Sequence, residues 1–323
     1  HLRIAREMLP NVEIMVMRHE PTKEIPGFAD LVTASLDESV QFRPQLAIIA
    51  TPAPFHLATA TALAEAGCHL LIEKPIASQI HGVSEFLTGA RSAQIVCQVG
   101  YNMRFLSSLA EFRRLIQQGV VGQPLSLRCE VGQYLPDWRP GTDYRQGVSA
   151  RQELGGGVLL ELSHELDYLR WILGPANWVS AWTGNLSDLE VDVEDTAFLT
   201  LSLTSPVDGR AIAATLSLDC IRRDTTRTCL VLGSEGSLRW NALTGTVEQY
   251  KIEKKSWEIV FCQHQVRDES YRAQFANFLE CVHSKKKPLV DGESALEVLL
   301  IIDAARRSMQ RGGLRQKITK HLS

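Results

Sequence analysis

The sequence predicts an α/β protein of two domains: a Rossmann domain (a doubly wound parallel sheet), then an α+β domain with a large, mostly antiparallel open sheet. Three observations predict this class. Apolar runs alternate with helical patterns over roughly the first hundred residues, as in successive βα units. From about residue 125, strand patterns follow one another directly, separated by hairpin-like breaks. A length of 323 residues also suggests two domains.

The first domain is expected over residues 1–119. Its first strand pattern runs from Val12 to Met17, and Ser35 with Glu38 forms a capping box that begins a short helix. Gly67 is a typical end for the helix that follows Thr51-Pro52. Further buried strands are expected at 45–50, 69–72 and 94–99, and helices at about 53–66 and 105–117.

The second domain is expected over residues 120–323. Breaks such as Pro206-Val207-Asp208-Gly209 and Gly233-Ser234-Glu235-Gly236 separate its strands. Two closing helices are predicted at about 269–283 and 293–309. The strands are expected at about 125–134, 177–185, 196–204, 210–219, 228–233, 237–241, 247–252 and 257–262.

The beginning of the chain departs from the pattern of a dinucleotide-binding domain. Such a domain opens with a strand and a G-x-G-x-x-G turn, whereas residues 1–9 already look helical. One interpretation is that the fold never had this turn; we favour a missing amino-terminal strand and turn. The chain as given should then bind a dinucleotide poorly, since the amides that hold a pyrophosphate are missing, and restoring the upstream segment should recover the affinity.

Composition excludes several classes of protein. The formal net charge is −3 and there is no basic stripe, so a nucleic-acid partner is not expected. No apolar run is long enough to span a bilayer and no signal peptide opens the chain, which favours a cytoplasmic protein without a membrane partner. The seven cysteines include no C-x-x-C pair, so structural disulfides and a cysteine zinc site are not expected.

A charged pair follows the apolar strand at 69–72. Proline restricts the backbone of the residue before it, so Pro75 holds Lys74 extended at the carboxyl edge of the sheet. Open α/β sheets bind ligands at that edge. The segment Glu73-Lys74-Pro75 therefore indicates a functional lysine, with a solvated loop lysine as the alternative.

A second group of polar residues follows Gly155-Gly156-Gly157. His164 and Asp167 lie three residues apart on one predicted helix over 158–173, so the carboxylate could orient the imidazole as a general acid/base. The alternative is a buried structural histidine. The glycine triplet favours a site, because it would let the backbone approach a ligand closely. A metal site built on Glu161, His164 and Asp167 is less favoured, since no second histidine has ligand spacing.

A loop after the strand at 125–134 combines aromatic and arginine side chains. It contains Trp138-Arg139 and Tyr144-Arg145. Aromatic faces beside guanidinium groups suit a polyhydroxylated or carboxylated ligand, although ordinary loops and interfaces also carry such residues.

Together these motifs resemble the Gfo/Idh/MocA family, which is named after glucose-fructose oxidoreductases, inositol dehydrogenases and rhizopine-catabolism proteins. The resemblance covers nearly the whole chain. It rests on the order and spacing of Ala50-Thr51-Pro52 with His56, Glu73-Lys74-Pro75, the segment from Val99 to Phe105, Gly155-Gly156-Gly157 ahead of His164 and Asp167, and the segment from Pro288 to Gly292.

The resemblance implies NAD or NADP as cofactor and a second domain similar to that of glyceraldehyde-3-phosphate dehydrogenase, with subunit contacts on its sheet. A homodimer or homotetramer acting on a sugar, sugar acid or cyclitol is expected, with Lys74 as catalytic lysine and His164 as acid/base; Asp167 is added as a catalytic residue because of its spacing from His164. Expected cofactor contacts are Arg18, His19, Thr51, Pro52, His56, Glu73, Lys74, Asn102, Trp138 and Arg139. Expected substrate contacts are Lys74, Arg104, Tyr144, Arg145, Glu161 and His164.

Two features depart from the family pattern. Many members have an aspartate four residues before the histidine, whereas Glu161 precedes His164 by three. The glycine turn is also missing. Arg18 and His19 at the end of the first strand favour NADP over NAD slightly, because an arginine there suits the 2′-phosphate. Two other functions stay open: a non-catalytic sugar or nucleotide sensor, and a lyase or glycosidase that uses bound NAD transiently.

Overall fold

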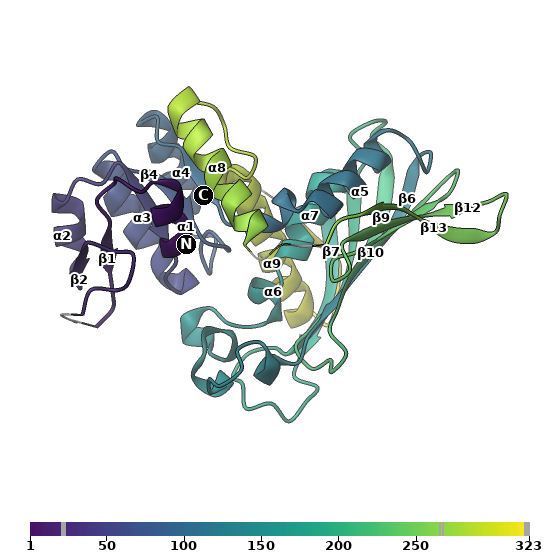
Figure 1. Cartoon of the computed structure of the whole chain (residues 1–323). Coiled ribbons are helices and arrows are strands. Elements are labelled where there is room, and N and C mark those ends of the chain that lie inside the picture. Colours follow the sequence, from purple (N-terminus) through teal and green to yellow (C-terminus); the bar gives the residue numbers. More distant parts are fainter. Residues whose placement is uncertain (21–23, 265, 267, 320–323) are drawn as a thin grey trace.

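Two parts lie side by side in the computed structural model, which describes residues 1–20, 24–264, 266 and 268–319. Figure 1 shows short strands and helices in one part and a broad sheet in the other, with α8 (Glu269–Ser284) and α9 (Gly292–Gln310) between them. Among the described helices, none has the length and apolar character required to cross a bilayer.

The first part contains two separate parallel sheets. One pairs β1 (Met15–Met17) with β2 (Leu31–Thr33), and the other has the order β3-β4-β5. The strands of the second sheet are β3 (Leu46–Ile49), β4 (His69–Ile72) and β5 (Cys97–Val99). The helices before β6 are α1 (Leu2–Met8), α2 (Leu36–Gln41), α3 (His56–Glu65), α4 (Val83–Ser92) and α5 (Ser107–Gln117). The parallel pairing confirms the Rossmann-like class of this part.

Local sequence explains several of these elements. Ser35 accepts a hydrogen bond from the Glu38 amide at 3.3 Å and so begins α2. The Glu38 carboxylate instead receives the Thr33 hydroxyl, so only half of the predicted capping box forms. Leu70, Leu71 and Ile72 of β4 are buried because this strand has a neighbour on either side and helices on both faces.

The second part is built on one sheet of nine strands in the order β13-β12-β11-β10-β6-β9-β8-β7-β14. All neighbours are antiparallel except β6 and β9, which are parallel, so the expected mostly antiparallel sheet is confirmed. Its strands are β6 (Pro124–Gly132), β7 (Ala176–Gly184), β8 (Thr196–Thr204), β9 (Ala211–Asp219), β10 (Thr226–Gly233), β11 (Ser237–Asn241), β12 (Thr246–Lys251), β13 (Ser256–Cys262) and β14 (Gln316–Lys317).

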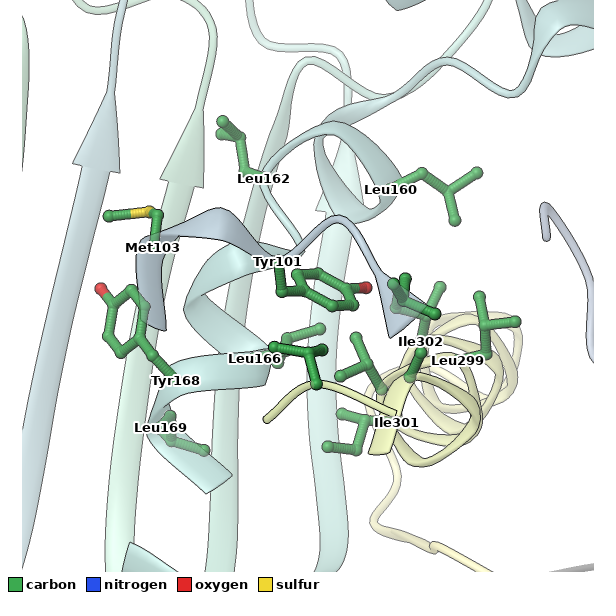
Figure 2. Packing of buried hydrophobic residues seen from close by; sticks show 14 of the residues in the cluster. Tyr101, Met103, Leu160, Leu162, Leu166, Tyr168, Leu169, Leu299, Ile301 and Ile302 are labelled. Atoms are coloured by element: carbon green, nitrogen blue, oxygen red, sulfur yellow. The ribbon is translucent and has the colours of Figure 1, made fainter. Parts of the chain in front are cut away.

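Helices cover one face of this sheet. Figure 2 shows Tyr101 of the segment after β5 among side chains of α7 (His164–Leu173) and α9, including Leu166 and Ile302. Burial alternates along the strands: Ala197, Leu199 and Leu201 of β8 face this core. The opposite face carries exposed apolar side chains.

Two differences from the sequence predictions concern the helices next to the candidate site and between the two parts. The single helix expected over 158–173 is broken at Leu162-Ser163 into α6 (Val158–Glu161) and α7. In addition, α8 packs against the first part, because Phe275 and Phe278 share a buried cluster with Ile4 and Leu71. The short 3-10 helices are Ala53–Phe55, Asn102–Phe105, Leu135–Asp137, Tyr144–Gln146, Val148–Ala150 and Gln152–Leu154.

Candidate active site

Lys74 reaches from the first part of the molecule to the second. It follows β4 by two residues, and its ammonium donates a hydrogen bond of 2.9 Å to the main-chain oxygen of Glu161 at the end of α6. The same nitrogen lies 4.0 Å from the Glu161 carboxylate. Because only 17% of the Lys74 side chain is exposed, the cation is held at a defined point.

His164 is the first residue of α7 and is half-buried. Its ring packs edge-on against Tyr101, with ring centres 5.6 Å apart. Its Nδ1 is buried and has no hydrogen-bond partner within the described part of the chain. Burial lowers the pKa of His164 well below its usual value, and the charges of Lys74 and Arg227 lower it further. The imidazole is therefore neutral at neutral pH and able to accept a proton.

Lys74 and His164 are 90 residues apart in the sequence but lie in one region of the structure. The ammonium is bonded to Glu161, three residues before His164, and its charge acts on the imidazole. The large hollow of about 790 Å³ lies elsewhere, over the face of the nine-stranded sheet. We locate the candidate site by the converging side chains, because chemistry depends on the reacting groups rather than on the size of a hollow.

Glu161 also belongs to this group. Its carboxylate accepts a hydrogen bond of 3.0 Å from Ser149, while its main-chain oxygen holds Lys74. Glu161 therefore lies beside the predicted catalytic lysine, and its contact with a substrate stays a prediction.

The glycine triplet is explained by contacts within the protein. A Cβ at Gly156 would lie 2.4 Å from the Val148 oxygen, and one at Gly157 would lie 2.6 Å from the Glu194 carboxylate. Gly155 has a φ of +79° and lies against Pro54 of the first part. The glycines therefore allow close approach to other residues of the same protein, in place of the expected close approach to a ligand.

Asp167 does not contact His164, contrary to expectation. Its carboxylate accepts two hydrogen bonds from Arg104, of 2.8 and 2.5 Å, and both side chains are buried. The remaining Arg104 nitrogen donates to the Leu289 oxygen at 3.0 Å. Burial raises the pKa of Asp167, and the guanidinium opposes this shift. The expectations that Asp167 orients the imidazole and that Arg104 faces a substrate are therefore wrong: the two residues satisfy each other.

Several expected cofactor residues lie at the carboxyl ends of the parallel strands. Arg18 and His19 are exposed directly after β1, and Thr51-Pro52 follows β3. The Thr51 hydroxyl is buried without a partner in the described residues. Glu73 accepts a hydrogen bond from the Lys74 amide and lies 2.5 Å from the His1 ring. An unpaired hydroxyl at this edge fits a ligand rich in hydroxyl groups, such as a dinucleotide.

Two of the expected cofactor residues are engaged by the protein itself. The His56 ring nitrogens lie 2.9 and 2.7 Å from the main-chain oxygens of Pro75 and Thr51. Burial lowers the pKa of His56, while these two acceptors oppose the shift. Asn102 donates to the Ser270 hydroxyl at 3.0 Å. His56 and Asn102 therefore hold the segments around the candidate site instead of presenting free nitrogens to a cofactor.

The aromatic and arginine loop makes no recorded contact with Lys74 or His164 within the described residues. Trp138 donates to the Gln133 oxygen at 2.9 Å, and Arg139 is exposed. The Tyr144 hydroxyl accepts from the Glu190 amide, and Arg145 pairs with Asp143 and Glu190. Contacts of these four residues with cofactor or substrate stay predictions.

Sequence reasoning did not find two residues beside His164. Arg227 of β10 lies with its Nε 2.9 Å from the Glu165 carboxylate, and Glu165 is fully buried. Arg227 reads as an ordinary strand residue, because its place beneath α7 depends on β10 lying next to β6 in the sheet. No signal in one sequence gives that order. Among the described residues, no cluster of side chains could hold a metal ion.

The fold is that of a two-domain protein whose first domain has the parallel strands of a nucleotide-binding domain. A family model described as an oxidoreductase family with an NAD-binding Rossmann fold matches residues 15–101. The companion model, the C-terminal alpha/beta domain of the same family, matches residues 113–318. The chain belongs to the Gfo/Idh/MocA oxidoreductase family, as its motifs indicated.

Three known proteins show how similar this chain is to others in sequence and in structure. The chain is 27% identical over 269 residues to a myo-inositol 2-dehydrogenase of Thermotoga maritima, covering 79% of this chain and 74% of that protein. It is 24% identical to the scyllo-inositol 2-dehydrogenase (NAD(+)) of Bacillus subtilis, covering 82% and 75%. A levoglucosan dehydrogenase in complex with NADH superposes with a TM-score of 0.85 at 18% identity, covering 98% and 95% of the two chains. The last likeness shows the shared fold.

Proposed function

We propose that this protein is an NAD(P)-dependent dehydrogenase or reductase that acts on a hydroxyl or carbonyl group of a sugar, sugar acid or cyclitol. The observation that carries the proposal is the convergence of the held Lys74 ammonium and the unprotonated His164 imidazole. The inositol dehydrogenases among its relatives support the substrate class.

The two side chains divide the work on one substrate oxygen. A bound nicotinamide would accept or supply the hydride. His164 takes the hydroxyl proton during oxidation and returns it during reduction, which its neutral state at neutral pH permits. Lys74 donates a hydrogen bond to the same oxygen, so that it positions the substrate and stabilises the developing negative charge. Tyr101 supports the edge of the imidazole.

The test is an assay of the protein expressed from its complete reading frame with NAD or NADP and a panel of sugars and cyclitols. We expect net cofactor reduction, and a loss of about 100-fold or more in kcat for Lys74→Met and His164→Asn. The matched control is Lys254→Met, which removes a surface lysine paired with Glu258 in the hairpin of β12 and β13. Sugar binding without turnover would support a sensor, and conversion without net cofactor reduction would support a lyase or glycosidase.

Cofactor choice is proposed to favour NADP slightly. Arg18 is exposed at the first position after β1, where an arginine suits the 2′-phosphate. We expect Arg18→Ala to lower kcat/KM with NADP and to leave that with NAD nearly unchanged. A native preference for NAD that the substitution does not alter would contradict this choice.

The protein is further proposed to form a homodimer or homotetramer through the open face of the nine-stranded sheet. Trp182 and Phe198 lie exposed on that face with ring centres 6.0 Å apart. They line the hollow of about 790 Å³ together with Met309. An exposed apolar face of this kind is typical of a surface that binds a partner.

A further inference from the structure

The Arg227 guanidinium is ion-paired through its Nε, whereas its two terminal nitrogens form no ion pair with the described residues. Its Nε lies 2.9 Å from the Glu165 carboxylate, and the arginine side chain is 25% exposed while that of Glu165 is 0% exposed. This contact is an ion pair, because neither the Nε nor the second Glu165 oxygen has a hydrogen-bond partner among the described residues. The two terminal nitrogens form no ion pair in the same part of the chain. Since a guanidinium carries five N–H groups, most of the hydrogen-bonding capacity of Arg227 is unused.

The contrast with Arg104 shows that this state is unusual for an enclosed arginine here. Arg104 has all three nitrogens engaged, by Asp167 and by the Leu289 oxygen. Unpaired donors in a partly buried place cost free energy unless water or a ligand satisfies them. Because the Arg227 side chain is 25% exposed, water reaches its terminal nitrogens, and a polar ligand that displaces this water can bind there.

The position of Arg227 connects these terminal nitrogens to the reaction site. Its partner Glu165 is the residue after His164, and the charges of Arg227 and Lys74 both act on the same imidazole. A substrate whose reacting oxygen lies between Lys74 and His164 would therefore extend toward Arg227. Glu165 points into the core and already balances one positive charge, so the outward half of the guanidinium is the part left to recognise a ligand.

We propose that Arg227 binds a carboxylate of the substrate, which makes a sugar acid the preferred substrate class. This inference rests on the function proposed above. The two terminal nitrogens of a guanidinium match the two oxygens of a carboxylate in one plane, which gives both strength and orientation. Such a pair would fix which carbon of the sugar faces the nicotinamide.

The experiment compares matched acidic and neutral sugars. Cofactor reduction is measured with D-glucuronate and D-galacturonate against D-glucose and D-galactose, each free and linked to UDP, with D-glucose 6-phosphate as a different anion. We expect kcat/KM for the uronates to exceed that for the neutral sugars by about 100-fold, the size of a buried charge-pair contribution. Arg227→Gln also leaves the Glu165 carboxylate without its counter-charge, so turnover of every sugar should fall. Turnover of the uronates should fall much further than that of the neutral sugars, mainly through KM, so that the preference is lost.

Two further variants make the result specific. Arg239→Gln is the matched control, because Arg239 also pairs its Nε with a glutamate, Glu248. Arg239 lies opposite Leu230 of β10, three residues from Arg227, so its side chain is on the other face of the sheet, and this variant should keep the preference. Arg227→Lys keeps the charge without the paired nitrogens and should keep only part of the preference. If Arg227→Gln does not fold, Arg227→Lys replaces it as the test. Loss of neutral-sugar turnover in Arg227→Lys would then indicate a structural role for Arg227.

Each outcome decides between the ideas. If Arg227→Gln lowers turnover of acidic and neutral sugars equally, Arg227 only positions Glu165 and the inference is wrong. A native enzyme that prefers neutral sugars or the phosphate overturns the carboxylate assignment and leaves the dehydrogenase function standing. If no sugar of any class is oxidised, both proposals fall.

Discussion

Two cations, Lys74 and Arg227, act on one half-buried imidazole in this protein. The free energy of protonating His164 is raised by burial first and by these two charges next. A base with a lowered pKa binds a proton weakly, but it is present in the unprotonated form over the whole neutral range. In the proposed reaction Lys74 offsets the weak basicity, because a hydrogen bond from its ammonium to the substrate oxygen would make the hydroxyl proton easier to remove.

The pH dependence of oxidation follows from this arrangement. Because the pKa of His164 lies below the ordinary 6.5, kcat/KM should stay level through neutral pH and fall only below that value. Removing the neighbouring cation in Lys74→Met raises the pKa, so the acid limb should move to higher pH. A pH profile of kcat/KM for the two proteins checks this. An acid limb that stays in place would show that Lys74 does not act on His164.

The pair of Arg104 and Asp167 should matter for stability more than for chemistry. Asp167→Asn leaves a buried guanidinium without its counter-charge, which costs about 3 to 5 kcal/mol of unfolding free energy. Equilibrium denaturation in guanidinium chloride measures the loss. His164→Asn is the control and should change stability far less, since the Nδ1 atom has no partner to lose in the described residues. An Asp167→Asn variant that is stable but inactive would contradict this prediction and indicate that Asp167 takes part in the reaction.

At this scale the sequence predicted some residues and not others for a physical reason. The sequence singles out Lys74 and His164 because each stands in a local motif with an evident constraint, a following proline or a preceding glycine triplet; their catalytic roles stay predictions. Asp167 was assigned to His164 because spacing along a helix was the only geometry available. Its true partner Arg104 is 63 residues away, and only tertiary packing brings the two together.

At the scale of elements, the segment between the 3-10 helix Val148–Ala150 and α7 contacts both parts of the molecule. The three glycines let this segment turn back on itself, with Gly156 against the oxygens of Val148 and Ser149. The segment places Ser149 within hydrogen-bond distance of Glu161, and Glu161 holds Lys74. A shift in this turn would therefore move Glu161 and, through it, the Lys74 ammonium at the candidate site.

Adding a methyl group at position 156 tests whether the glycine turn positions Glu161 and Lys74. In Gly156→Ala the new carbon would meet main-chain oxygens that cannot rotate away, so we expect a loss of about 1 to 3 kcal/mol of stability and weaker activity. Gly89→Ala is the control: Gly89 is exposed within α4 with no atom near its added carbon, and alanine there should stabilise by about 0.5 to 1 kcal/mol. Thermal unfolding compares the two. Equal effects would contradict the role given to Gly156.

Most elements of the second part were predicted within two residues, because apolar and polar residues alternate along many of their strands and glycine or proline separates several of them. The helix over 158–173 was predicted as continuous since its apolar spacing continues across the break at Leu162-Ser163. Two elements of the first part were not predicted: α4, whose Gly89 weakens the helical pattern, and β2, a strand of three residues. The order of strands in the sheet lies beyond local pattern altogether.

At the scale of the whole molecule, the uncovered face of the nine-stranded sheet should set the oligomeric state. We expect a particle of two or four chains of 36.0 kDa each, and dissociation when Phe198→Glu places a charge on this face. Light scattering after gel filtration measures both. Val207→Glu, a change at an exposed turn, should have no effect. A native monomer, or an unchanged mass for Phe198→Glu, would contradict this interface.

The position of α8 has a consequence for how the protein is made. Phe275 and Phe278 complete a cluster with Leu71 of β4 and Ile4 of α1, and they are translated after the whole nine-stranded sheet except β14. A nascent chain that has emerged only as far as β5 must therefore leave the apolar face of Leu71 open to water or to a chaperone. Since that face closes only when α8 leaves the ribosome, the nucleotide-binding half, although first in sequence, is among the last parts to reach its final packing.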